Sequence, residues 1–110
     1  MRRFLKLLIQ RKTLRQIAPR VREISNRCHG EVWERVHDRI FDMDLNEARG
    51  YIRARAMMPI RSHIKAEIGT DSHLSPDARQ QLMLLVTERV VHSVVTDFIT
   101  GSRVARRSAA

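Results

Sequence analysis

Cysteine, proline, glycine and aromatic residues are all scarce in this chain of 110 residues. A single cysteine, Cys28, excludes an intramolecular disulfide framework and is typical of a reducing compartment. Only four glycines and three prolines are present, which disfavours turn-rich β-sandwiches and barrels. The five aromatic residues offer few flat rings on which unpaired bases could stack.

Long apolar runs are missing as well, since the longest, Leu82–Val86, has five residues and a membrane-spanning helix needs about 18. Residues 1–9 imitate a signal peptide, but Lys6 interrupts the apolar stretch and no small-residue cleavage site follows. A mitochondrial presequence is the closer match, although Thr13 is the only hydroxyl residue before Ser25. We therefore expect a cytoplasmic protein without a transmembrane segment, with an organelle reached through a basic presequence as the alternative.

Positive charge dominates what is present, with 21 Lys and Arg against 12 Asp and Glu, a net charge of +9. Its distribution is uneven. Residues 1–22 carry a charge of +8 without any acid, residues 23–100 carry −2, and residues 101–110 carry +3, again without any acid. The excess charge therefore belongs to the two ends of the chain and not to its middle.

Apolar residues recur at helical spacing along nearly the whole chain, so the sequence predicts an all-α fold. We expect a first helix over residues 4–17 that ends at Pro19. A long helix over 19–42 follows, and Gly30 lies inside it at a cost of about 1 kcal/mol, with a break at His29–Gly30 as the alternative. One half-cylinder of that helix carries Val21, Ile24, Cys28, Val32, Trp33, Val36, Ile40 and Met43, which we assign to the core.

Two more helical segments complete the chain. Asp44 and Glu47 have the spacing of a capping box and open a helix that Pro59 kinks or restarts and Gly69 ends. Ser75 is a helix cap for the last segment, 76–100, whose apolar residues cover much of its circumference. We expect Gly101 to end this helix.

The expected architecture is therefore an irregular bundle of four to five helices, with helix 76–100 at its centre and helix 19–42 as its long partner. Residues 19–101 form the single helical domain. Residues 1–18 form a basic amphipathic N-terminal segment, and residues 102–110 form a flexible basic tail.

Two Glu–His pairs are the candidates for a metal site. Glu34 and His37 have the i, i+3 spacing of di-iron carboxylate helices, and Glu88 and His92 form a second pair on the last helix. The ligand set is incomplete, and Glu34 and His37 project onto the charged side of their helix. A solvated helix face is the simpler interpretation, so these four residues are weak candidates and no cofactor is predicted.

Catalytic motifs are absent. His92 and Glu88 lie near Ser93, but the sequence offers no nucleophile elbow, oxyanion hole or third partner. The isolated glycines form no phosphate-binding loop. Cys28 lies on an apolar stripe, which favours a buried thiol over a reactive one. We therefore predict that the protein is not an enzyme.

The unopposed cations are the remaining candidates for function. They are Arg2, Arg3, Lys6, Arg11, Lys12, Arg15, Arg20 and Arg22 at the N-terminus and Arg103, Arg106 and Arg107 at the C-terminus. They could contact nucleic-acid phosphates, lie on an anionic membrane surface, or belong to a solvated helix that docks Leu7, Leu14 and Ile17 on the acidic middle of the chain.

From these patterns we predict a small non-enzymatic helical binding or adaptor protein. Its basic N-terminal segment would contact an anionic partner, with nucleic acid preferred, while its body could contact a protein or a second copy of the chain. A peripheral membrane-surface protein is the first alternative. An enzyme accessory or metal-binding helical protein is the second.

Overall fold

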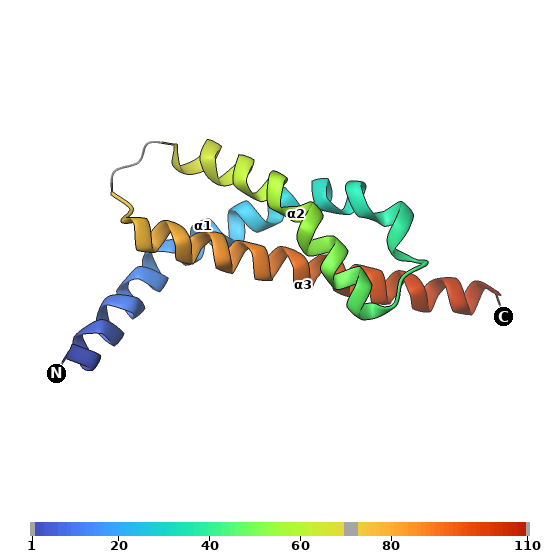
Figure 1. Ribbon diagram of the computed structural model, residues 1–110, viewed down its shortest axis with the longest axis horizontal. Coiled ribbons are helices and arrows are strands. Elements are labelled where there is room, and N and C mark those ends of the chain that lie inside the picture. The colour runs from blue at the N-terminus through green and yellow to red at the C-terminus, as the bar shows by residue number, and fades with distance from the viewer. Residues whose placement is uncertain (1, 70–72, 110) are drawn as a thin grey trace.

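Three helices make up the fold. The computed structural model describes the backbone of residues 2–69 and 73–109, and the side chains of residues 11–69 and 73–101. The helices are α1 (Arg2–Ile40), α2 (Leu45–Ile68) and α3 (Pro76–Ala109), and each packs against the other two. In Figure 1, α1 and α3 run in the same direction along the long axis and α2 returns in the opposite direction. The predicted all-α class is confirmed, but the expected number of four to five helices is wrong.

Two prolines inside helices explain why there are fewer helices than expected. Pro19 lies inside α1 and Pro59 inside α2, and neither ends its helix. A proline in a helix interior costs about 3 kcal/mol, because it removes one hydrogen bond and crowds the preceding turn. Buried apolar side chains on both sides offset this cost, namely Ile17 and Val21 around Pro19. Pro59 is itself fully buried, so α2 keeps its packing through the proline.

Glycines do not interrupt the helices either. Gly30 lies in an unbroken stretch of α1, so the alternative of a break at this position is wrong. The prediction that Gly101 ends the last helix is also wrong, since α3 continues to Ala109. A Cβ atom at Gly101 would lie 3.0 Å from two ring atoms of Phe41, so this glycine serves the close approach of α3 to an aromatic ring.

An aromatic cluster surrounds that contact. The Phe41 ring packs against Phe98 with centroids 5.7 Å apart and meets the edge of Trp33 at 6.3 Å. Trp33 is half-buried and packs against the core, as its position beside the apolar stripe indicates. The cluster joins the end of α1 to the C-terminal half of α3.

The core follows the predicted apolar stripes closely. On α1 the fully buried side chains include Ile24, Cys28, Val32, Val36 and Ile40. On α2 the small residues Ala48 and Ala56 are fully buried together with Ile52 and Ile60, which allows close approach of the neighbouring helices. The buried residues of α3 are Ala78, Leu82, Val86, Thr87, Val90, Val91, Val94, Val95 and Phe98.

Helix ends occur where polar side chains satisfy free backbone groups. The amide of Glu47 donates to Asp44 Oδ1 at 2.8 Å, and the amide of Ala78 donates to Ser75 Oγ at 3.1 Å. Gly69 ends α2 with a positive φ of 54°, and its amide donates to the Lys65 carbonyl at 2.8 Å. The three predicted caps are confirmed. No helix in the described part of the chain carries an apolar stretch that could cross a bilayer.

Candidate functional site

The N-terminal part of α1 precedes the core. Ile17 is the first residue of α1 with a described side chain that is buried, and Arg11, Lys12 and Arg15 before it are all exposed. Figure 1 shows this part of α1 projecting past the end of the bundle. Ile17 packs on the bundle, as expected if the basic helix docks on the middle of the chain. Leu14, however, is 43% exposed, and the side chain of Leu7 lies outside the described residues.

Arginines form a stripe on one face of α1. At 3.6 residues per turn, Arg11, Arg15 and Arg22 fall within about 40° of one another, on the side away from Ile17 and Ile24. All three are exposed, and within the described residues none of them forms an ion pair. We call Arg11, Arg15 and Arg22 the arginine stripe. Lys12 is exposed beside it.

The other predicted cations divide into two groups. Arg20 is half-buried and takes part in an interaction within the protein, so it is not a free surface charge. The side chains of Arg2, Arg3, Lys6, Arg103, Arg106 and Arg107 lie outside the described residues, although their backbone is helical. The two basic ends lie at opposite ends of the molecule in Figure 1, so they do not form one patch.

Several acidic side chains of the body form ion pairs with cations of the body. Arg27 binds both Glu23, at 2.8 Å, and Glu67, at 2.5 Å. Glu31 receives Arg35 at 3.3 Å and His63 at 2.9 Å. These pairs hold body carboxylates against body cations, and none of them involves the arginine stripe.

The metal candidates do not converge. Glu34 is exposed, and the His37 ring stacks on Trp33 at 6.0 Å with Nδ1 lying 3.1 Å from the Trp33 carbonyl. Glu88 accepts a 2.5 Å hydrogen bond from Arg53 of α2, which lowers the pKa of Glu88, whereas His92 is exposed. Within the described residues, no group of three His, Cys, Asp or Glu side chains could hold a metal ion.

A Ser–His–Asp arrangement joins α1 to α3, and the sequence did not predict it. His29 Nδ1 lies 2.7 Å from Ser93 Oγ, and His29 Nε2 lies 2.6 Å from Asp97 Oδ2. The Ser93 hydroxyl donates to the Val90 carbonyl at 3.0 Å. The two ring nitrogens of His29 therefore bridge two side chains of α3.

This geometry does not suit a hydrolase. A nucleophilic serine gives its proton to the histidine, but Ser93 gives its proton to the backbone of its own helix. The amides around Ser93 belong to the interior of α3 and make helix hydrogen bonds, so they cannot form an oxyanion hole. His29, Ser93 and Asp97 therefore act as a polar link between two helices. In the sequence, only the i, i+4 spacing of Ser93 and Asp97 indicates that these two side chains share a face of the helix. Their contact with His29 depends on how α1 packs against α3.

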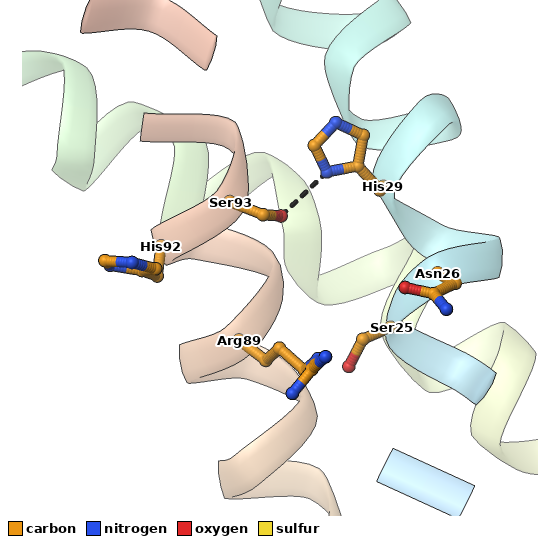
Figure 2. A pocket seen from close by; sticks show the side chains of 6 residues that line it. All are labelled: Ser25, Asn26, His29, Arg89, His92 and Ser93. Atoms are coloured by element: carbon orange, nitrogen blue, oxygen red, sulfur yellow. Dashed lines mark hydrogen bonds between the residues drawn. The ribbon is translucent and has the colours of Figure 1, made fainter. Parts of the chain in front are cut away.

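A polar groove of about 540 Å³ lies beside this link (Figure 2). Its lining residues come from α1 and α3 and are Ser25, Asn26, His29, Arg89, His92 and Ser93. Ser25 is only 3% exposed, and its hydroxyl has no hydrogen-bond partner. Arg89 is exposed and forms no ion pair within the described residues. We call this the α1–α3 groove.

Comparison with known proteins gives no guide to function, because no protein-family model, curated protein or solved structure matches the chain.

Proposed function

We propose that this protein is a small non-enzymatic binding protein whose basic N-terminal helix contacts the phosphates of a nucleic acid. The observation that carries the proposal is the arginine stripe, an exposed row of guanidinium groups on one face of α1. Arginine suits this role because its planar guanidinium can donate two parallel hydrogen bonds to a phosphate.

The length of the arginine stripe favours an extended anionic ligand and not a small anion. Arg11 and Arg22 are eleven positions apart, which corresponds to about 16 Å along a helix. Phosphates of one strand of a duplex recur at about 3.4 Å along the axis, so the stripe spans several of them. A small anion could meet only one or two of the three guanidinium groups.

The charge pairing within the body supports an external partner. Carboxylates of Glu23, Glu31 and Glu67 are held by Arg27, Arg35 and His63. An arginine stripe without such a partner keeps its attraction for anions in solution, and this attraction weakens as salt screens it.

The test is the salt dependence of binding to a short DNA duplex, followed by fluorescence anisotropy. For duplex DNA the slope of log K against log salt concentration is about −0.9 for each phosphate contact. Replacing Arg11, Arg15 and Arg22 with Gln should therefore reduce the slope by about 2 to 3 and weaken binding at low salt.

A matched control removes the same charge elsewhere. Arg39, Arg55 and Arg61 are exposed on the body and form no ion pair within the described residues, and their replacement with Gln should leave the slope nearly unchanged. Equal effects of the two triple variants would show that only net charge matters, and the absence of binding at low salt would end the proposal.

A membrane surface is the competing partner, favoured by the exposure of Leu14 on the same part of α1. Flotation of the intact protein with anionic liposomes checks it. Flotation that depends on the arginine stripe, together with no binding to duplex or single-stranded nucleic acid, would favour the membrane over the proposed partner.

A further inference from the structure

We propose that the α1–α3 groove is a binding site for a single phosphate group, held mainly by Arg89 and Ser25. The site is distinct from the arginine stripe, because it lies between two helices and its central charge comes from α3. Its ligand would be a tetrahedral phosphate oxyanion, either free or as one phosphate of a longer chain.

The hydroxyl of Ser25 is the observation that points to a ligand. A buried hydroxyl without a hydrogen-bond partner costs about 1 to 3 kcal/mol, and most buried polar groups in proteins are paired. Ser25 is 3% exposed, lines the groove and has no partner. An oxyanion in the groove would accept a hydrogen bond from this hydroxyl and so remove the cost.

Arg89 supplies the charge. Its guanidinium is directed toward the same part of the groove as the Ser25 hydroxyl (Figure 2), and within the described residues it has no carboxylate partner. A guanidinium and a hydroxyl both donate hydrogen bonds, and the side-chain amide of Asn26 at the rim adds further donors. Such a set suits a phosphate, whose oxygens accept several bonds at once.

The carboxylate of Asp97 is engaged by His29, a residue of the groove lining. Asp97 accepts from His29 Nε2 at 2.6 Å, and the other ring nitrogen of His29 is bound to Ser93. This link engages the Asp97 carboxylate with His29 of α1, so it is not paired with Arg89. His92 is exposed at the rim, and its ring points away from Ser25 and Arg89 (Figure 2).

The α1 residues Asn26 and His29 of the groove lie on the same side of the helix as the arginine stripe. Asn26 and His29 fall within about 40° of the mean direction of the stripe on α1. A phosphate in the groove could therefore belong to the nucleic acid proposed above, and in that form the inference rests on the proposed function. Binding of free phosphate does not depend on it.

Two ligands distinguish these sources. Amide spectra of the ¹⁵N-labelled full chain are recorded during addition of inorganic phosphate, with chloride at equal ionic strength as the reference, and separately during addition of a single-stranded oligonucleotide. We expect shifts at Ser25, Asn26 and Arg89 with at least one ligand, and at least tenfold weaker binding after Arg89→Gln. Arg39→Gln, the same change on an exposed arginine remote from the groove, should not alter the affinity.

Ser25→Ala separates binding from folding. Because this substitution deletes an unpaired buried hydroxyl, thermal unfolding should occur at the same or a higher temperature while phosphate binding weakens severalfold. The proposal is overturned if neither ligand shifts the groove resonances, or if Arg89→Gln and Ser25→Ala bind as the wild type does. Loss of duplex binding in the arginine-stripe variant leaves the free-phosphate result unaffected, so the two proposals fail separately.

Discussion

Replacing Gly30 with alanine tests the continuity of α1. Gly30 lies in the interior of a helix at an exposed position, and a Cβ atom there would meet no other atom within 4 Å. Alanine restricts the unfolded chain more than glycine does and makes no unfavourable contact here. The expected gain is the difference in helix propensity, about 0.8 to 1 kcal/mol.

Gly101→Ala is the matched comparison, because it makes the same chemical change inside another helix. The new Cβ would lie 3.0 Å from Cε1 and Cζ of Phe41. The ring would have to move away from Phe98 and Trp33, against which it packs. We therefore expect Gly101→Ala to be no more stable than the wild type, in spite of the same propensity gain.

Thermal unfolding followed by circular dichroism measures both variants. For a domain of about 100 residues, 1 kcal/mol corresponds to a shift in Tm of roughly 4 °C or slightly more, so Gly30→Ala should raise Tm by about that amount. A lower Tm for Gly30→Ala would mean that the chain turns at this position and would refute the continuous helix. A larger gain at Gly101 than at Gly30 would refute the packing of Phe41 against α3.

Three further predictions concern the core, a cap and the thiol. Ile24→Ala should cost about 2 to 5 kcal/mol in urea unfolding, because Ile24 is fully buried, and a cost below 1 kcal/mol would contradict that packing. Asp44→Ala should lower the stability through loss of the cap on the Glu47 amide. The hydrogen bond from the Glu47 amide lowers the pKa of Asp44. The stability that this cap contributes is therefore present above the unfolded-state pKa of Asp44 and is lost as the pH falls through its folded-state pKa. Acid unfolding of the wild type and of the variant measures this difference. Burial raises the pKa of Cys28 to about 11, so alkylation at pH 8 should be slow in the native protein and fast in urea, and equal rates would contradict the burial.

Periodicity in the sequence predicted the core of α1 well, because an apolar stripe on one helix is a local property. Val21, Ile24, Cys28, Val32, Val36 and Ile40 are all buried as expected. The caps at Asp44, Gly69 and Ser75 were predicted for the same reason, since each depends only on the neighbouring three or four residues.

Helix boundaries were predicted less well, because packing competes with local preference. Pro19 and Gly101 are strong local signals for a helix end, yet both lie inside helices. Burial of Ile17 and Val21 offsets the cost of the proline, and the Phe41 ring takes the space that a side chain at Gly101 would fill. Neither compensation can be read from the local sequence.

The α1–α3 groove could not be predicted from the sequence. His29 and Asp97 are 68 positions apart, and Ser25 and Arg89 come from different helices. The sequence places His92 and Glu88 near Ser93, but it does not show that Ser93 meets His29 of α1. The register between α1 and α3, which is set by the whole core, decides which polar residues meet.

Because α1 and α3 run in the same direction, the N-terminus and the C-terminus lie at opposite ends of the molecule, which we call its two poles. Its longest extent is 59 Å, and the acid-free segments of the chain lie at its two ends. A polymer that reached both poles as a duplex would need about 17 base pairs, at 3.4 Å for each. Under the proposed function, a shorter duplex would therefore contact only one end of the molecule, the N-terminal end that carries the arginine stripe.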